Sequence, residues 1–411
     1  MNKPELAWKV QNSSHIGVVH PNFVLRDKHL ALVYELRDLK ERIDRILRVQ
    51  IMAFETIQYL NEQGDLAKGY SPKVADDVVI KAYKTMVVTR HVDERMLTLQ
   101  RQGIITFSLS SLGEECCSVA AAAALSSDDW LYPQYREVGV MFWRGFSIQD
   151  FVHHMFGNAK DLNKGRQMPN HFGSRELNVV TVSSPIATKI PHAAGCGYAM
   201  KLQKEPTISA VFFGDGATSE GDFHAGMNFA AVLKVPTLFF CRNNAYAIST
   251  SLDHQFHSDG IAPKGEGYGV ATYRVDGNDF FAVYDTVAEA RKHCLEKGPV
   301  LIEAMTYRMG AHSTSDDPTR YRKKGEIKEW QEKDPVLRLR RYLEKQGLWD
   351  DKKEKKLWEG VKKEVTEAIG VAKKTPNPPL KTLIEDVYCE VPKTLQRQID
   401  DLKEFFPEDP S

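Results

Sequence analysis

The chain has 411 residues, 42% of them apolar, which is enough for one large hydrophobic core or two ordinary ones. Lysine plus arginine and aspartate plus glutamate number 55 each, and this balance argues against a nucleic-acid binder. No run approaches the roughly 18 apolar residues of a membrane span, so we expect neither nucleic acid nor a membrane among the partners.

The start of the chain and its cysteines bear on the compartment. The sequence MNKPELAWKV has no signal-peptide core, and Glu5 with few arginines argues against a transit peptide. The six cysteines include no CxxC pair, which favours reduced thiols over a disulfide frame or a zinc site. We expect a cytoplasmic protein, or a mitochondrial-matrix protein if the source is eukaryotic.

Residues 1–75 are predicted to form an N-terminal arm. Apolar residues recur at helical spacing over 28–53 with charges between them, which predicts an amphipathic helix. This helix could pack on a partner subunit, on a neighbouring copy or on its own domain. The sequence NEQGD at 61–65 is typical of a hairpin-like turn.

Two helices and two loops are predicted next. The helices span 74–101 and 111–125, and the alanine run of the second indicates close packing. We expect its Cys116 and Cys117 to be small core residues and not ligands. Tyr135 and Arg136 lie on a loop, and 157–173 forms a second, basic loop.

The segment 206–250 is the most informative part of the chain. An apolar run of strand length, 208–213, ends in the turn Gly214-Asp215-Gly216. A helical pattern and a second apolar run, 235–241, follow, and the run ends in Arg242-Asn243-Asn244. This order predicts a βαβ unit, so Asp215 and Asn244 leave the carboxyl ends of parallel strands, where open α/β sheets bind ligands.

The remaining elements complete an α/β fold with a mostly parallel central sheet flanked by helices. We expect a β/α stretch at 274–279, a helix over 280–296 and a buried strand over 299–308. From 334 the chain is charged and helical, with a proline-rich break at 375–380 and a last helix near 392–405. The predicted organisation is an arm (1–75), an α/β domain (76–330) and a C-terminal helical segment (331–411).

The residue types at the predicted sheet edge suit a hard divalent cation that carries a diphosphate. Asp215 offers a carboxylate oxygen and Asn244 an amide oxygen, and Mg²⁺ combines few protein oxygens with water and phosphate oxygens. The glycines allow the backbone to approach a diphosphate closely. A lone Gly-Asp-Gly is weak, but here 26 residues (217–242) separate it from Asn243-Asn244, which is a strong pattern.

Gly-Asp-Gly, this spacing and Asn-Asn resemble the thiamin diphosphate motif. The surrounding sequence resembles the α subunits of branched-chain 2-oxo acid dehydrogenase decarboxylating components from roughly residue 54 onward. The matching stretches are YREVGV, GRQMPNHFG, SSPIATKIP, GDGATSEGD, FFCRNNAYAIST, RVDGNDFFAVY, LIEAMTYRMGAHSTSDD and DPVLRLRRYL.

The resemblance implies thiamin diphosphate and Mg²⁺ as cofactors and assigns residues to them. Asp215, Asn244 and the main-chain oxygen of Tyr246 are the implied metal ligands, although the family commonly has glutamate in place of Asp215. The implied cofactor-binding residues are Tyr135, Arg136, Ser184, Ile186, Gly214, Asp215, Gly216, Ala217, Arg242, Asn244, Tyr246 and His312. Ser184 and Ile186 match residues beside the aminopyrimidine ring, whereas Tyr135, Arg136, Arg242 and His312 match diphosphate contacts.

The implied catalytic residues are His312, Tyr135 and Ser184. His312 follows a strand pattern on a polar loop, where a histidine can bond a phosphate or a carboxylate and titrate near neutrality. The family typically has His-His here and this chain has Ala311-His312, so only the second position is kept.

Two further features follow from the same resemblance. Ser313 matches a regulatory phosphoserine, where an added dianion would repel the cofactor. Ser183, Pro185 and Thr188 match a monovalent-cation site, but this chain has Lys189 where relatives carry a neutral side chain. The ammonium of Lys189 could replace that cation.

The resemblance also implies partners. The glutamate that activates the aminopyrimidine comes from a separate β subunit, so we expect an α₂β₂ heterotetramer that serves a lipoyl-bearing transacylase core. The nearest alternative is the α subunit of a pyruvate or acetoin dehydrogenase. A noncatalytic subunit is disfavoured by the site residues, and an NAD-dependent oxidoreductase by the lack of a GxGxxG turn between strand and helix.

Overall fold

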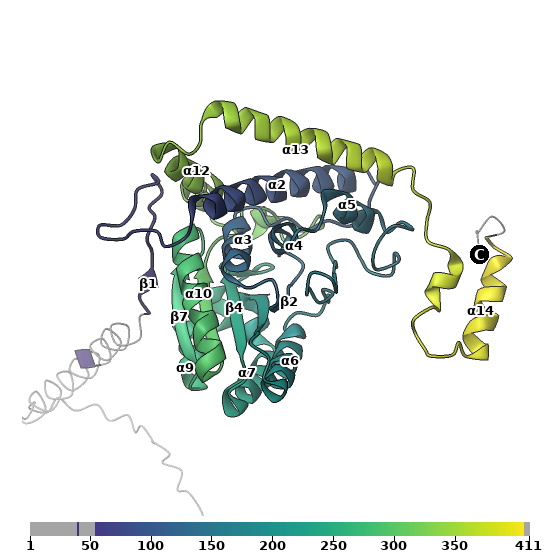
Figure 1. The fold of residues 1–411 in the computed structure, drawn as a ribbon, viewed down its shortest axis with the longest axis horizontal. Coiled ribbons are helices and arrows are strands. Elements are labelled where there is room, and N and C mark those ends of the chain that lie inside the picture. The colour runs from purple at the N-terminus through teal and green to yellow at the C-terminus, as the bar shows by residue number, and fades with distance from the viewer. Residues whose placement is uncertain (1–38, 41–53, 407–411) are drawn as a thin grey trace, which may run out of the picture. The chain divides into compact units, whose positions relative to one another are not determined.

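A six-stranded sheet in the order β1-β7-β8-β4-β3-β2 forms the centre of the protein (Figure 1). Its strands are β1 (Thr56–Ile57), β2 (Trp130–Tyr132), β3 (Ser209–Gly214), β4 (Thr237–Asn243), β7 (Ala271–Asp276) and β8 (Val300–Met305). All neighbouring strands of this sheet run parallel. The predicted fold class, an α/β fold with a mostly parallel sheet, is therefore confirmed.

The computed structural model describes residues 39–40 and 54–406. The predicted amphipathic helix over 28–53 lies outside the described residues, apart from Leu39 and Lys40. No helix in the described part of the chain is both long enough and apolar enough to span a bilayer.

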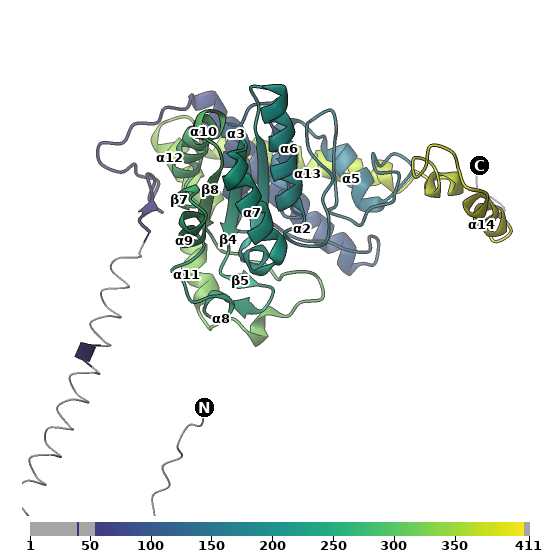
Figure 2. The same ribbon diagram turned by 90° about the horizontal axis from the view of Figure 1, so that it is seen from below.

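Helices cover both faces of the sheet. The helices of the described residues are α2 (Asp76–Arg101), α3 (Glu115–Ala124), α4 (Val138–Arg144), α5 (Ile148–Phe156), α6 (Lys189–Gln203), α7 (Gly221–Leu233), α8 (Leu252–Gln255), α9 (Ala262–Gly267), α10 (Phe280–Lys297), α11 (Glu326–Glu332), α12 (Pro335–Lys345), α13 (Asp351–Ala372) and α14 (Lys393–Lys403), of which α14 lies away from the sheet. In Figure 2, α6 and α7 lie together across the sheet. A short antiparallel pair, β5 (Tyr246–Ala247) and β6 (Thr250–Ser251), lies outside the main sheet.

The central strands divide the hydrophobic core into two layers because successive side chains of a strand point to opposite faces. In β3, Ala210 and Phe212 join the cluster that includes residues of α2, α3 and α10. Val211 and Phe213 join the second cluster, which includes residues of α6 and α7. A strand buried on both faces explains the continuous apolar run in the sequence.

The predicted βαβ unit is present as β3, α7 and β4. Gly214 pairs with Arg242 across the two parallel strands, so the residues that follow them emerge at the same edge. The chain does not enter α7 directly, because residues 215–219 first form a 3₁₀ turn, η1 (Asp215–Ser219). The Thr218 hydroxyl closes this turn by donating to the main-chain oxygen of Asp215 at 2.8 Å.

The helix predicted over 111–125 begins only at Glu115. The carboxylate of Asp93 accepts hydrogen bonds from the main-chain N and the hydroxyl of Ser111, at 2.7 and 2.6 Å. Gly113 has φ +93°, which also keeps this stretch out of the helix. Cys116 and Cys117 are buried with free thiols, so their prediction as core residues is confirmed.

The two flanking regions contact the α/β core. Strand β1 pairs with β7, and α12 and α13 pack against α2. The proline-rich break separates α13 from α14 as predicted. Residues from 54 onward form one compact unit by their contacts, while the predicted domain limits at 75/76 and 330/331 stay predictions.

Candidate active site

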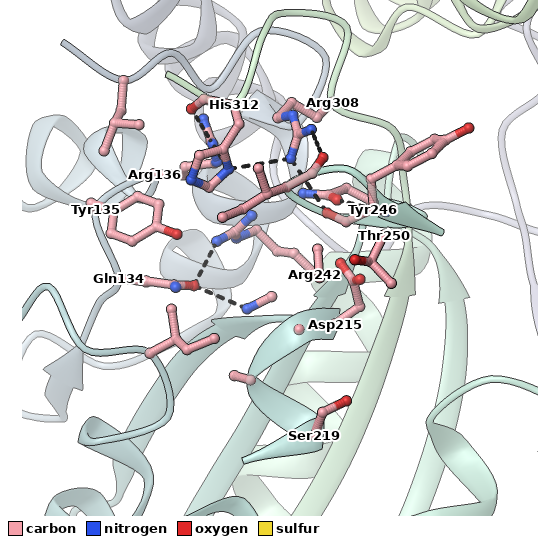
Figure 3. A pocket seen from close by; sticks show the side chains of 18 of the residues that line it. Gln134, Tyr135, Arg136, Asp215, Ser219, Arg242, Tyr246, Thr250, Arg308 and His312 are labelled. Carbon is pink, nitrogen blue, oxygen red and sulfur yellow. Dashed lines mark hydrogen bonds between the residues drawn. The ribbon is translucent and has the colours of Figure 1, made fainter. Parts of the chain in front are cut away.

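A cavity of about 780 Å³ opens at the carboxyl ends of β3 and β4 (Figure 3). Every residue that the sequence assigned to the cofactor lines it: Tyr135, Arg136, Ser184, Ile186, Gly214, Asp215, Gly216, Ala217, Arg242, Asn244, Tyr246 and His312. These residues come from separate segments of the chain, so the fold brings together a constellation that the sequence spreads over 178 positions (135–312).

Asp215 and Asn244 follow β3 and β4 directly and are both buried. Burial raises the pKa of the Asp215 carboxyl, and a hydrogen bond donated by Gln255 Nε2 to its Oδ2 at 2.7 Å opposes that change. Asn244 Oδ1 accepts from the main-chain N of Tyr246 at 3.3 Å. The main-chain oxygen of Tyr246 in turn accepts from Arg308 Nη1 at 3.3 Å.

This donor set suits a hard cation. It provides one carboxylate, one amide oxygen and one main-chain oxygen, a set that leaves room for water and phosphate oxygens around Mg²⁺. Across residues 39–40 and 54–406, no group of three or more His, Cys, Asp or Glu could hold a metal ion.

The glycine turn needs its glycine at position 216. A Cβ added to Gly216 would lie 2.8 Å from the Cβ of Ala247. At Gly214 the main-chain N donates to Gln134 Oε1 at 3.0 Å, which fixes the end of β3. The close approach of Ala247 therefore makes any side chain at position 216 sterically costly.

Arg242 lies on the cavity floor and is held by three side chains. Its Nη1 donates to Glu114 Oε1 at 2.7 Å, its Nε donates to Glu137, and its Nη2 donates to Gln134 Oε1 at 3.2 Å. Arginine has five N–H donors, so two remain for another acceptor. Burial alone would lower the pKa of Arg242, but the carboxylates of Glu137 and Glu114 raise it.

His312 contacts two arginines. Arg136 Nη2 lies 3.1 Å from His312 Nδ1 and donates to the main-chain oxygen of His312 at 2.6 Å. Arg308 Nη1 lies 3.5 Å from the same Nδ1. Burial, together with Arg136 and Arg308, lowers the pKa of His312 to about 3.

Two consequences follow for the chemistry of His312. The expectation that it titrates near neutrality is wrong for this structure, because burial and two cationic neighbours keep the imidazole neutral. Since arginine is only a donor, Nδ1 must accept, and the proton of the neutral ring then lies on Nε2. His312 therefore offers an N–H donor to an anionic group.

Tyr135 stands beside this group. Its ring meets the ring of His312 edge-on, with centroids 6.2 Å apart, and the Arg136 guanidinium lies 5.5 Å from its centroid. Arg136 is buried and also donates to the main-chain oxygen of Ser110 at 2.5 Å. Tyr135, Arg136 and His312 thus form one contiguous polar corner of the cavity (Figure 3).

Ser184 and Ile186 lie on the loop that precedes α6. Ser184 is exposed, and its Oγ lies 2.7 Å from Nε2 of the buried His171. His171 Nδ1 lies 3.0 Å from the main-chain oxygen of Pro169, so Nδ1 donates and Nε2 accepts from the Ser184 hydroxyl. Burial lowers the pKa of His171, which is consistent with a neutral ring.

The residues matched to a monovalent-cation site lie just before and at the start of α6. Ser183 Oγ is buried and has no hydrogen-bond partner within 39–40 and 54–406. Lys189 is the first residue of α6, and burial lowers the pKa of its ammonium. A helix N-terminus disfavours a cation, so the position of Lys189 is electrostatically costly. The role of this group stays a prediction.

The loop that carries Ser313 is fixed from one side. The carboxylate of Asp316 accepts from the main-chain N of His312 at 2.7 Å and from the Tyr321 hydroxyl at 2.6 Å. Arg308 Nη2 donates to the same Tyr321 hydroxyl at 3.1 Å. A negative charge added at Ser313 would therefore appear beside a carboxylate that orders the loop.

Sequence reasoning missed several residues that hold the site. They are Glu114, Gln134, Glu137, His171, Gln255 and Arg308, of which Gln134, His171, Gln255 and Arg308 line the cavity. Their signal in the sequence was weak, since each is a polar residue without periodic context. Three of them stood inside stretches that carried the resemblance: Glu137 in YREVGV, His171 in GRQMPNHFG and Arg308 in LIEAMTYRMGAHSTSDD.

Comparison with known proteins gives matches that cover most of the chain. The family model described as the dehydrogenase E1 component matches residues 83–381. The 2-oxoisovalerate dehydrogenase subunit alpha 1, mitochondrial, of Arabidopsis thaliana is 49% identical over 339 residues, or 82% of this chain and 72% of the relative. The mitochondrial alpha subunit of Caenorhabditis elegans with the same enzyme name is 47% identical over 377 residues, or 89% and 88% of the two chains. The corresponding Homo sapiens subunit is 44% identical over 368 residues, or 88% and 83%.

Proposed function

Because the chain belongs to the dehydrogenase E1 component family, we propose that it is the α subunit of a thiamin diphosphate- and Mg²⁺-dependent 2-oxo acid dehydrogenase. The enzyme decarboxylates branched-chain 2-oxo acids oxidatively and transfers the acyl group to a lipoyl domain. The observation that carries the proposal is the gathering of every predicted cofactor residue around one cavity. Its volume of about 780 Å³ lies within the range of ordinary cofactor pockets.

The names of the similar relatives support the branched-chain substrate over pyruvate or acetoin. The relatives described above are each called 2-oxoisovalerate dehydrogenase subunit alpha. Identities of 44–49% over most of the chain favour a substrate class shared with these relatives over a substrate of another enzyme of the family.

Each side of the cavity has a separate task in this proposal. Asp215, Asn244 and the main-chain oxygen of Tyr246 would hold Mg²⁺, and Arg136 and Arg242 would pair with diphosphate oxygens. When bound, thiamin diphosphate supplies the electron sink for loss of CO₂. The protein contributes positioning and electrostatic stabilisation.

His312 and Tyr135 are proposed to bind the anionic parts of cofactor and substrate. The Nε2–H of the neutral His312 can donate to a phosphate oxygen or to the carboxylate of a 2-oxo acid. Phe107, Leu109 and Met168 add an apolar wall to the same cavity, which limits water and strengthens these charge interactions. Ser184, oriented by His171, is the proposed polar contact on the aminopyrimidine side.

The proposed assembly is an α₂β₂ heterotetramer. The alpha-subunit names of the relatives support a second kind of subunit. In this proposal the β subunit supplies the glutamate that activates the cofactor, and the heterotetramer serves a lipoyl-bearing transacylase core. We place the complex in the cytoplasm of a prokaryote or in the mitochondrial matrix of a eukaryote, since the relatives are mitochondrial proteins.

An artificial-acceptor decarboxylation assay tests the proposal. The chain is co-expressed with its β subunit and assayed with and without thiamin diphosphate and Mg²⁺, on 3-methyl-2-oxobutanoate and on pyruvate. We expect turnover that needs both cofactors and favours the branched acid. A preference for pyruvate would move the protein to the other branch of the family, and turnover without thiamin diphosphate would contradict the proposal.

A further inference from the structure

Glu114 is a buried carboxylate at the N-terminus of α3, and its side chain makes no capping bond to that helix. One carboxylate oxygen, Oε1, accepts from Arg242 Nη1 at 2.7 Å and from Asn244 Nδ2 at 2.9 Å. The other, Oε2, has no hydrogen-bond partner among the residues that the structure describes and lies 3.9 Å from Arg136 Nε. Three residues of the candidate active site therefore meet at a residue that does not line the cavity.

The contact with Asn244 decides which way its amide points. A carboxylate only accepts, so the NH₂ group of Asn244 must face Glu114 and its oxygen must face away. Without this partner the two ends of an amide are nearly equal in shape, and either could be presented to the cavity. Only the oxygen end is a ligand for a hard cation.

Glu114 also balances charge. Arg136, Arg242 and Arg308 all line the cavity, and three positive charges around one cavity repel one another. Although burial alone would raise it, the pKa of Glu114 is lowered by Arg242, Arg136 and the hydrogen bond from Asn244.

We propose that Glu114 is a positioning residue for the metal and diphosphate site: it aims the amide oxygen of Asn244 at the cation and holds Arg242 against the cavity floor. The inference rests on the function proposed above. In this proposal Glu114 acts from outside the cavity, and the position of its carboxylate oxygens matters more for metal binding than its negative charge.

The charge and geometry of Glu114 predict opposite effects of one substitution. In Glu114→Gln the site gains a net positive charge, which by electrostatics alone would tighten the binding of an anionic diphosphate. If Glu114 acts by position, the same variant instead lets the amide of Asn244 turn and weakens metal-dependent binding. Glu114→Asp separates the two effects further, because it keeps the charge and withdraws the oxygen from both donors.

Glu115 supplies a matched control. It is the next residue, it is equally buried, and it is ion-paired with Arg90 at 2.7 Å. It does not line the cavity. Glu115→Gln therefore removes a buried charge from the same helix terminus without changing the candidate active site.

The experiment measures thiamin diphosphate binding by calorimetry as a function of Mg²⁺ concentration, on the complex with its β subunit. We expect Glu114→Gln and Glu114→Asp to raise the Mg²⁺ concentration for half-maximal binding about 10-fold or more, as loss of a ligand-orienting partner typically does. For Glu115→Gln the Mg²⁺ concentration for half-maximal binding should stay within about twofold of the wild-type value, which is less than the smallest change expected for the Glu114 variants. Melting temperatures of all variants report any loss of folding separately.

Three outcomes overturn the inference. Unchanged or tighter binding in Glu114→Gln would mean that charge, not position, is what Glu114 contributes. If Glu114→Gln does not assemble, unchanged Mg²⁺ dependence in Glu114→Asp would lead to the same conclusion. Absence of Mg²⁺-dependent thiamin diphosphate binding in the wild type would overturn the proposed function itself. If the wild type binds thiamin diphosphate in a Mg²⁺-dependent way, the variants test the role of Glu114 alone.

Discussion

The two walls of the cavity are held in different ways. On the sheet-edge wall, Asp215, Arg242 and Asn244 follow or end strands, and each is buried with side-chain partners. On the loop wall, Ser184 is exposed with one side-chain partner, and His312 lies on the loop that also carries Ser313, where Asp316 accepts from the main-chain N of His312. The difference suits a division of labour, since side chains on strands are placed more precisely than side chains on loops.

We infer that the sheet-edge wall is complete within this chain and that the loop wall is where further molecules act. A site that must hold a metal and a diphosphate needs fixed oxygens and donors before the ligand arrives. A wall of loops can be completed by a partner subunit or altered by a modification. Four predictions test this comparison.

The largest effect is expected at the sheet edge. Asp215→Ala removes the only carboxylate among the proposed metal ligands. Mg²⁺-dependent thiamin diphosphate binding should therefore fall by more than the ~10–100-fold that is typical when a residue hydrogen-bonded to a metal ligand is lost. Calorimetric titration of the complex with its β subunit measures the affinity for thiamin diphosphate in the presence of Mg²⁺. Asp222→Ala, an exposed residue of the first turn of α7, is the control and should bind as the wild type does. Similar binding by both variants would show that the metal lies elsewhere.

On the loop wall, Ser313→Glu should lower turnover by roughly 10-fold or more. A charge placed near a diphosphate and Asp316 adds repulsion of about 1–4 kcal/mol per close pair, depending on exposure. Steady-state rates on 3-methyl-2-oxobutanoate measure the loss. Ser315→Glu, on an exposed residue two positions on, should cost much less. Full activity of Ser313→Glu would remove the loop from the regulated part of the site.

A smaller effect is expected from pH. Since the folded-state pKa of His312 lies at about 3, below its ordinary value, the folded protein binds this proton less readily than the unfolded chain. Its contribution to stability is therefore present above pH 6.5 and is lost as the pH falls towards 3. When the pH is lowered from 7.5 to 5, the melting temperature of His312→Asn should fall by roughly 2 °C less than that of the wild type. The exposed His224→Asn serves as control, and equal pH dependence in His312→Asn and wild type would contradict the neutral imidazole.

The smallest effect concerns Lys189. If its ammonium replaces a monovalent cation, wild-type activity should change by less than about twofold when sodium replaces potassium, since the charge is already supplied. Lys189→Met should then acquire potassium dependence. Lys201→Met, near the far end of α6, should not. Strong potassium dependence of the wild type would refute the replacement.

Local signals were enough to predict the sheet edge but not its supports. The run 208–213 is apolar except for Ser209 because β3 is buried on both faces, and the turn at Gly216 needs a glycine, so both are visible in the sequence. Glu114 and Gln134 are polar residues of distant segments, and nothing local distinguishes them from solvated ones. The late start of α3 depends on Gly113, which is a local signal, and on Asp93, a residue 22 positions before Glu115 whose contact with Ser111 no local pattern could reveal.

The chemistry of His312 shows a similar limit. Its place on a loop after β8 was predictable, because a strand pattern precedes it. Its neutrality was not, since it depends on Arg136 and Arg308, of which Arg136 comes from another part of the chain. A pKa is a property of the assembled neighbourhood, which the sequence does not display.

The most direct test of the account is a crystal structure of the complex with its β subunit, thiamin diphosphate and Mn²⁺. Mn²⁺ favours the same octahedral oxygen set as Mg²⁺ and gives an anomalous signal that locates it. The account predicts one anomalous peak in contact with Asp215, Asn244 Oδ1 and the main-chain oxygen of Tyr246. A peak that is bound elsewhere, or a diphosphate that does not reach Arg136, Arg242 or His312, would contradict it.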